Sequence, residues 1–313
     1  MRRLSPLAAL LICVWTSIQA GQTVVTASFS LPGDWARVLL GETVQLHVLA
    51  GPNTDLHAYQ ASPADTRKLL ASDLIIGIDP SLEPWLEQIT SSNNLSDKVL
   101  WLGKPWLSER LGAPKKTYSH RHSGDCNHGE CLHGDEDPHL WMDPLIVEAM
   151  VGALAQRCAQ LPGMDQRVLT KRRADYTEAV RSLDKDIAEA LARIPAERRI
   201  IVTHHGNLGR FADRYGIRIA GVILRSSSTE AADPSARALA ELIRVGRERG
   251  VAAVIRDRGQ RAPAADTLAR ASGLPPPIEL SVDSLDAPGT PSDSWLGMMR
   301  ENTRLLTEAL KSE

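Results

Sequence analysis

The chain has 313 residues, 43% of them hydrophobic, which is enough for two domains that each bury a core. Its 36 basic and 38 acidic residues are mixed along the sequence and leave a formal net charge of -2. No basic stripe of the kind that binds nucleic acid is present in this sequence, so we expect no nucleic-acid partner.

The first residues, "MRRLSPLAALLICVWTSIQA", have the layout of a secretory signal peptide: two arginines precede a short apolar run that ends in a small residue. We expect cleavage after Ala20 and an exported, soluble mature protein. Small residues of a lipoprotein cleavage site do not precede Cys13, which argues against a lipid anchor. In an oxidising compartment Cys126 and Cys131 can close a small disulfide loop, with Cys158 left over on an apolar helix face.

Eight apolar or alternating stretches predict β-strands. They are residues 23–30, 43–51, 73–78 and 98–103 in the first half, and 198–204, 218–223, 252–257 and 278–282 in the second. Helical patterns separate them. This alternation predicts an α/β fold of two lobes, each with a mostly parallel four-stranded sheet.

Several helix starts are clearly marked. Ser62, followed by Pro63 and by Asp65, comes close to a capping box. Asp143-Pro144 and Asp233-Pro234 follow the same pattern. The last pair is expected to open a helix that Gly250 can close in the left-handed conformation.

One long amphipathic helix is predicted between the lobes, within residues 163–195. Its apolar positions fall at helical spacing, at Val168, Leu169, Tyr176, Val180, Leu183, Ile187, Leu191 and Ile194. A helix of roughly 25 to 30 residues is ~40 Å long and stiff, so we expect the lobes in nearly fixed relation. The predicted organisation is a signal peptide (1–20), an N-terminal lobe (21–162), the helix (163–195) and a C-terminal lobe (196–313).

Five of the nine histidines lie between Ser119 and Pro144. The segment 112–138 is rich in His, Gly and Asp and nearly free of large apolar residues, so we predict a mobile surface loop. An auxiliary metal-collecting role is one hypothesis for its histidines, and a solvated loop that binds zinc only incidentally is the other. These histidines are His120, His122, His128 and His133.

Four positions follow predicted strands or precede a capped helix, where ligands gather in open parallel sheets. They are His57, His139, the pair His204 and His205, and Asp283. Three imidazoles and one carboxylate suit tetrahedral Zn2+ with no place left for a reacting water, whereas Mn2+ prefers more carboxylates. Each position also has an ordinary interpretation, as a loop, core or capping residue, and at least one of the histidine pair is expected to be structural.

Other polar and aromatic residues have ordinary interpretations. His47 lies inside a predicted strand and is expected to pack there. Asp257 lies between Arg256 and Arg258, which favours an ion pair over metal binding. The tryptophans are expected in the core or between the lobes, because no basic groups interleave with them.

Six motifs in order, "GPNTDLHAYQASPAD", "DPHLWMDP", "VTHHGNLGRFADRYGI", "STEAADPSARALAELI", "LSVDSLD" and "MMRENTRLLTEAL", resemble the metal-binding solute-binding proteins of ABC transporters (cluster A-I). Within this family the chain looks most like the periplasmic zinc-binding, ZnuA-like branch. The resemblance covers essentially the whole mature chain. It implies two α/β lobes joined by a long helix, with the metal in the cleft between them, held by His57, His139, His205 and Asp283.

The chain also departs from the family pattern. Gln60 stands where glutamate is frequent, Leu208 where an aromatic residue is usual, and Arg210 where tyrosine is common. These departures affect the surroundings of the four ligands. Asp257 stands where relatives often carry a glutamate that approaches the metal, and is a reserve candidate.

The resemblance implies a periplasmic receptor that is monomeric and not an enzyme. Such a receptor delivers Zn2+ to an inner-membrane ABC permease and its ATPase. A periplasmic zinc chaperone is a possible further partner. A manganese or iron receptor of the same family is the nearest alternative. Two more distant alternatives are a zinc chaperone or adhesin that acts without a permease, and a zinc hydrolase. A hydrolase needs an open coordination position and a general base, and this sequence contains no H-E-x-x-H motif.

Overall fold

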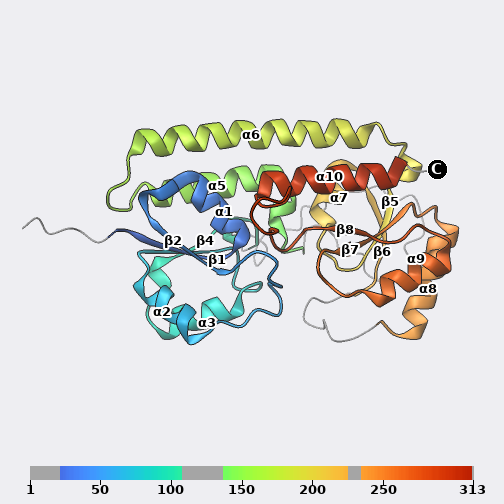
Figure 1. Cartoon of the computed structure of the whole chain (residues 1–313), viewed down its shortest axis with the longest axis horizontal. Helices are drawn as coiled ribbons and strands as arrows, with labels where there is room; N and C mark the ends of the chain where they lie inside the picture. Colours follow the sequence, from blue (N-terminus) through green and yellow to red (C-terminus); the bar gives the residue numbers. More distant parts are fainter. Residues whose placement is uncertain (1–21, 108–136, 225–233, 312–313) are drawn as a thin grey trace, which may run out of the picture.

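A computed structural model describes residues 22–107, 137–224 and 234–311. Two four-stranded sheets lie side by side, and one long helix, α6 (Gln166–Ala192), runs along the top of both (Figure 1). This is the α/β fold of two lobes that the alternation of strands and helices predicted.

The N-terminal sheet has the strand order β2-β1-β3-β4, and every neighbouring pair is parallel. The strands are β1 (Val24–Phe29), β2 (Gln45–Ala50), β3 (Leu74–Gly77) and β4 (Val99–Trp101). The helices are α1 (Ser30–Leu40), α2 (Pro63–Ala71), α3 (Pro84–Ser92) and α4 (Lys104–Leu107). Each helix connects or follows parallel strands, as such sheets require.

The C-terminal sheet repeats this plan, with the order β6-β5-β7-β8 and parallel pairs throughout. Its strands are β5 (Ile200–Thr203), β6 (Arg218–Val222), β7 (Ala253–Asp257) and β8 (Ile278–Leu280). Its helices are α7 (Gly209–Tyr215), α8 (Ala236–Glu248), α9 (Pro263–Ser272) and α10 (Trp295–Lys311). All eight predicted strands are therefore confirmed, each slightly shorter than predicted.

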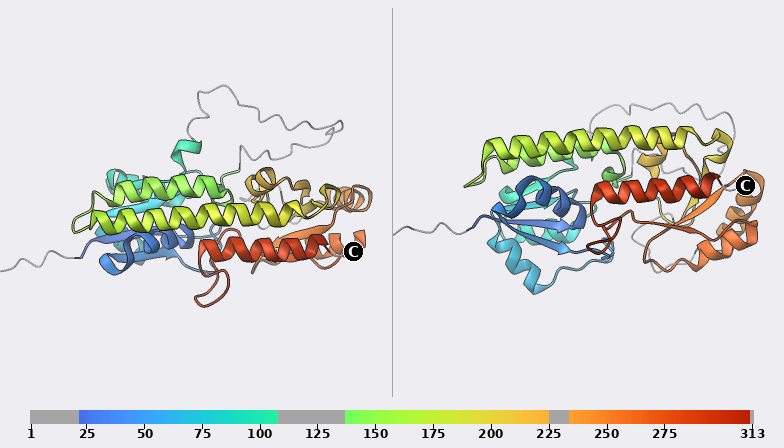
Figure 2. Two further views of the ribbon diagram at one scale, coloured as in Figure 1. Left: turned by 90° about the horizontal axis from the view of Figure 1, so that it is seen from above. Right: turned by 45° about the horizontal axis from the view of Figure 1, so that its top comes forward.

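Three helices form a layer across both lobes. In Figure 2, α5 (Pro144–Cys158), α6 and α10 lie side by side, and α6 packs against both of the others. The apolar stripe of α6 is buried, at Leu169, Tyr176, Val180, Leu183, Ile187 and Leu191. The prediction of one long amphipathic helix is confirmed, with 27 residues.

Tryptophans join the lobes. Trp35, Trp141 and Trp295 are fully buried in one hydrophobic core that includes residues of both sheets. The indole Nε1 of Trp141 donates to the Val282 carbonyl at 2.7 Å, and Nε1 of Trp295 donates to the Trp141 carbonyl at 2.9 Å. Asp34 of α1 accepts from the backbone N–H of Trp295 at 2.9 Å, at the start of α10. The buried indoles of Trp141 and Trp295, whose N–H groups are both satisfied, hold the lobes together.

Two of the predicted helix starts are confirmed and one is corrected. Ser62 and Asp65 form a reciprocal capping box at α2, and Asp143 caps α5 by accepting from the N–H of Leu145. At α8 the cap is the side chain of Ser235, which accepts from the N–H of Ala238. The helix therefore begins after Ser235, because this hydroxyl satisfies the free amides of the first turn.

Gly250 has a φ of 67° directly after α8, in the left-handed conformation predicted for it. Cys158 is a free, buried thiol at the end of α5. The predicted signal peptide, the histidine-rich loop with its four histidines, and Cys126 and Cys131 lie outside the described residues. Among the described helices, none is long and apolar enough to cross a membrane.

Candidate metal centre

Three of the predicted ligands meet between the lobes. Nε2 of His139 lies 3.4 Å from Nε2 of His57 and 3.4 Å from Oδ1 of Asp283, and Nε2 of His57 lies 3.5 Å from Oδ2 of Asp283. All three side chains are nearly buried, with exposures of 6 to 8%. Four atoms arranged tetrahedrally around Zn2+ at 2.0–2.1 Å lie about 3.3 Å apart, and the two separations from Nε2 of His139 are close to this value. Nε2 of His57 faces the other oxygen of Asp283.

The parallel sheets explain this convergence. His57 follows β2, and Asp283 follows β8, so each lies beyond the carboxyl end of a strand, where loops of both sheets meet. The carboxylate of Asp55 accepts the backbone N–H of His57 at 2.9 Å and fixes its turn. His139 precedes the short 3-10 turn Leu140–Met142 that leads into α5.

Asp137 holds the ring of His139 in place. Its Oδ1 accepts from Nδ1 of His139 at 2.6 Å and from the backbone N–H of His139 at 2.9 Å. A carboxylate can only accept, so Nδ1 carries the proton and Nε2 faces His57 and Asp283. The other oxygen, Oδ2, accepts from the backbone N–H of Gly209 at 3.0 Å, in the C-terminal lobe. One carboxylate thus orients a ligand and ties its loop to the other lobe.

The charges of the site suit a cation. Burial lowers the pKa of His139, but the negative charges of Asp283 and Asp137 outweigh burial and raise that pKa to about 9. Burial raises the pKa of Asp283, but the positive charge of His139 and a hydrogen bond from His57 lower it to about 2. Asp283 is therefore ionised at neutral pH, and His139 carries a proton that a divalent ion would have to displace if it bound there.

His205, the fourth predicted ligand, lies in a second cluster with His204 and Asp257, and all three residues are buried. Nδ1 of His205 donates to Oδ2 of Asp257 at 2.7 Å. Nδ1 of His204 lies 4.0 Å from the same oxygen, and the centroids of the two imidazole rings are 4.5 Å apart, with the ring planes tilted by 44°. Burial and the neighbouring His205 lower the pKa of His204, so this side chain favours the neutral form.

The sequence favoured an ion pair for Asp257, and its partner in the structure is His205, not one of the arginines that flank it. Arg256 pairs with Asp266 and Glu279, and Arg258 pairs with Asp286. Successive side chains of a strand point to opposite faces, so the arginines project away from Asp257, at the end of β7. Its carboxylate instead orients a predicted metal ligand.

Asn207 connects the two clusters and was missed in the sequence. Its Nδ2 donates to Oδ1 of Asp257 at 2.9 Å and to Oδ2 of Asp283 at 3.3 Å. The signal that could have revealed it is a polar side chain two residues after His205, in the loop that leaves β5. Through Asp257 and Asn207, His205 is linked by hydrogen bonds to the cluster of His57, His139 and Asp283.

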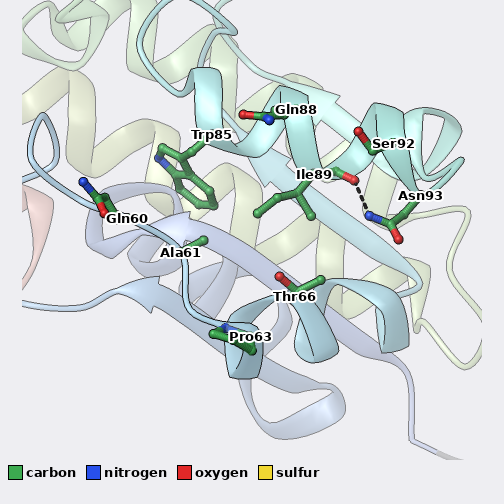
Figure 3. A pocket seen from close by; sticks show the side chains of 9 residues that line it. All are labelled: Gln60, Ala61, Pro63, Thr66, Trp85, Gln88, Ile89, Ser92 and Asn93. Carbon is green, nitrogen blue, oxygen red and sulfur yellow. Dashed lines mark hydrogen bonds between the residues drawn. The ribbon is translucent and has the colours of Figure 1, made fainter.

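The three departures from the family pattern have different surroundings. Nε of Arg210 donates to the carbonyl of Asp137 at 2.9 Å, which adds a second tie between the lobes. Leu208 is buried in the core. Gln60 lines a surface groove of about 640 Å³ between α2 and α3, together with Trp85 and Ile89 (Figure 3). His57, His139, His205 and Asp283 are not among the residues that line this groove.

Comparisons with known proteins agree with this architecture. The chain is 27% identical over 298 residues to the manganese-binding lipoprotein MntA of Bacillus subtilis (strain 168), covering 93% of this chain and 90% of MntA. It is 25% identical over 297 residues to PsaA of Streptococcus anginosus, named a manganese ABC transporter substrate-binding lipoprotein, covering 91% of this chain and 88% of PsaA.

A zinc-binding relative is equally similar. The zinc-binding protein TroA of Treponema pallidum (strain Nichols) is 26% identical over 297 residues, covering 93% of this chain and 89% of TroA. A solved structure of the periplasmic zinc-binding protein TroA matches with a TM-score of 0.74 at 26% identity, covering 93% of this chain and all of that one. The family model "ZnuA: Zinc-uptake complex component A periplasmic" matches residues 25–309, and the chain belongs to that family.

Proposed function

We propose that the chain is an exported receptor that binds Zn2+ and delivers it to an ABC importer. The observation that carries the proposal is the convergence of His57, His139 and Asp283 at 3.4 to 3.5 Å in a nearly buried position between the lobes. The ion is the cargo of such a protein. Membership of the zinc-uptake family and the names of the relatives support a metal-binding transport role.

In this proposal His205 is the fourth ligand. It follows β5, as Asp283 follows β8, so each lobe contributes two ligands. Asp257 holds Nδ1 of His205 just as Asp137 holds Nδ1 of His139. This repeated carboxylate–histidine pairing is the usual support for histidines that bind a metal through Nε2.

Zinc is favoured over manganese by the donor set. Three imidazoles and one carboxylate suit Zn2+, whereas Mn2+ prefers oxygen ligands and a higher coordination number. The manganese-binding relatives make a manganese receptor the second candidate.

Competition between the two ions tests the proposal. Chain without residues 1–20 is freed of metal and titrated with Zn2+ in the presence of a chelator of known affinity, with and without excess Mn2+. We expect one tightly bound Zn2+ per chain that excess Mn2+ does not displace, and loss of that site in His139→Ala. Displacement by equimolar Mn2+ would favour the manganese receptor, and absence of any tight site would refute the proposal.

The partners of this receptor are a membrane permease and its cytoplasmic ATPase, and we propose the periplasm as its location. A zinc chaperone would act before it, and the receptor would work as a monomer. Zinc-limited growth of a strain that lacks its own receptor tests this role. We expect the wild-type chain to restore growth and His139→Ala not to. If both restored growth, zinc transport would not require this site.

A hydrolase is the alternative of another class. It requires a metal-bound water in an open fourth position. In the proposed ligand set Asp283 fills that position, which favours a closed receptor site. Turnover of ester or amide substrates by the zinc-loaded chain, abolished in His139→Ala, would overturn this assignment.

The histidine-rich loop has a proposed auxiliary role. His120, His122, His128 and His133 would collect zinc weakly and pass it to the main site. Deletion of residues 119–135 should lower the number of weakly bound ions per chain and leave the tight site unchanged, as measured by titration. Loss of the tight site would contradict the separation of loop and site.

A further inference from the structure

The indole of Trp141 makes contacts on both sides of the proposed metal site. The side chain is fully buried, and its ring packs against the imidazole of His139 in a T-shaped arrangement, with the centroids 5.2 Å apart and the planes at 81°. Its Nε1 donates to the carbonyl of Val282 at 2.7 Å. One indole therefore contacts a proposed ligand of the N-terminal lobe and the residue directly before Asp283, a proposed ligand of the C-terminal lobe.

The hydrogen bond to Val282 acts on the backbone of Asp283. The carbonyl of Val282 and the backbone nitrogen of Asp283 belong to the same peptide unit, which is planar. A donor that fixes this carbonyl therefore also restricts the orientation of the backbone at Asp283. Val282 is buried, where a carbonyl that loses its donor is costly. The position of the Asp283 carboxylate thus depends on a side chain of the other lobe.

The segment 282–285 is held by the N-terminal lobe at its other end as well. Oγ of Ser30 accepts from the backbone N–H of Leu285 at 3.0 Å, and the backbone N–H of Asn53 donates to the carbonyl of Leu285 at 2.9 Å. This segment follows β8 of the C-terminal sheet, yet both of its ends are bonded to the N-terminal lobe. Its orientation therefore depends on contacts between the lobes, and Trp141 makes one of them.

Trp141 is itself held in place. Its ring packs against Phe29 with the centroids 5.4 Å apart and the planes at 63°, and its carbonyl accepts from Nε1 of Trp295 at 2.9 Å. Phe29 and Trp295 are both buried in the same core. Aromatic pairs at such separations and angles are favourable, so the indole is a rigid support for the groups that it contacts.

We propose that Trp141 is a positioning residue, which fixes the position of His139 relative to Asp283 across the two lobes. The inference rests on the proposed function, because it concerns two ligands of that metal site. A site binds its ion best when the ligands are held within about 0.5 Å of the required positions beforehand. Asp137 determines which nitrogen of His139 faces the site, whereas Trp141 determines where the imidazole lies relative to the carboxylate of Asp283.

The test compares Trp141→Phe with a matched control, Trp35→Phe. Phenylalanine keeps an aromatic ring and removes the N–H that reaches Val282. Trp35 is an equally buried indole of the same core and belongs to α1. Zn2+ affinity is measured by chelator competition, and the geometry of the ligands by the visible absorption of the Co2+-loaded chain.

In Trp141→Phe we expect the Zn2+ affinity to fall about tenfold, as is typical when a group supporting a ligand is lost. The Co2+ bands should shift or weaken, because the arrangement of the ligands around the ion changes. In Trp35→Phe the Zn2+ affinity and the Co2+ spectrum should stay close to those of the wild-type chain. Each variant shrinks a buried indole, so a loss of stability is expected in both.

An unchanged Zn2+ affinity or an unchanged Co2+ spectrum in Trp141→Phe, or equal changes in Trp35→Phe, would overturn the inference. If Trp141→Phe does not fold, β-(3-benzothienyl)alanine replaces phenylalanine at both positions with the same expected results, because it keeps two fused rings and lacks the N–H. Failure of the wild-type chain to bind Zn2+ tightly would instead refute the proposed function. The two failures are therefore distinguishable.

Discussion

The carboxylate of Asp137 accepts two hydrogen bonds from His139, one from its imidazole ring and one from its backbone N–H. The hydrogen bond from Nδ1 is 2.6 Å long and the one from the backbone N–H is 2.9 Å. Because Oδ2 of the same carboxylate also accepts from the backbone N–H of Gly209, the position of this proposed ligand depends on the C-terminal lobe.

The first prediction concerns these two hydrogen bonds between Asp137 and His139. Asp137→Asn should lower the Zn2+ affinity about 10- to 100-fold, because the amide no longer fixes Nδ1 as the protonated nitrogen of His139. Chelator competition measures the change. Asp143→Asn is the control: it alters another acid of the same segment, which caps α5 and does not contact His139. Equal losses of affinity in both variants would show that the effect is general loosening of the segment.

The second prediction separates the two adjacent histidines. His205→Ala should abolish the tight zinc site, because it removes the proposed fourth ligand. His204→Ala should leave Zn2+ affinity within a few-fold of wild type, with each affinity measured by titration. If His204→Ala destroyed the site while His205→Ala spared it, the assignment within this pair would be reversed.

The third prediction is that zinc binding weakens as pH falls. The pKa of His139 is about 9 in the metal-free protein, so this imidazole is protonated below that pH and must lose its Nε2 proton to bind. Because one proton must leave for each ion that binds, the apparent Zn2+ affinity should fall about tenfold for each pH unit between pH 8 and pH 6. Calorimetry in two buffers of different ionisation enthalpy should detect close to one proton released per ion at pH 7.5.

Asp137→Asn provides the control for this proton. Removing the negative charge of Asp137 lowers the pKa of His139, because that charge is one of the causes that raise it. Fewer protons should be released per Zn2+ in this variant at pH 7.5. A pH-independent affinity in the wild-type chain would show that His139 is already neutral.

The fourth prediction concerns the buried carboxyl of Glu83. Burial raises its pKa from 4.5 to about 7, although its Oε2 accepts from the backbone N–H groups of Ile78 and Asp79. The folded protein thus holds this proton more tightly than the unfolded chain. The contribution of this group to the free energy of unfolding should be largest below pH 4.5 and fall between pH 4.5 and pH 7. Above pH 7 it should be lower by on the order of 3 kcal/mol.

Glu83→Gln removes this ionisation and keeps an oxygen that can accept from the same amides. The variant should therefore lose this group's contribution to the difference in unfolding free energy between pH 5 and pH 8, as measured with urea. Glu87→Gln is the matched control, because Glu87 is an exposed glutamate of the same helix. An unchanged difference in Glu83→Gln would show that Glu83 does not titrate in this range.

The local elements could be predicted from the sequence alone. The strands, the 27-residue helix α6, the cap at Ser62 and the left-handed Gly250 follow from patterns within a few residues, and each is present. Hydrophobic period and capping chemistry act locally, so they can be read without knowing what packs against them. The one misplaced cap, at α8, lies where Ser235 adjoins the predicted Asp233-Pro234 pair.

The contacts that support the site could not be predicted from the sequence, because they form between distant segments of the folded chain. His57 and His139 are 82 residues apart, Asp137 and Gly209 are 72 apart, and Asn207 and Asp283 are 76 apart. No local pattern encodes such contacts, because they depend on the order of strands in two sheets and on the core that joins the lobes. The sequence between Arg256 and Arg258 therefore suggested an ion pair for Asp257 but could not identify its partner, which in the fold is His205.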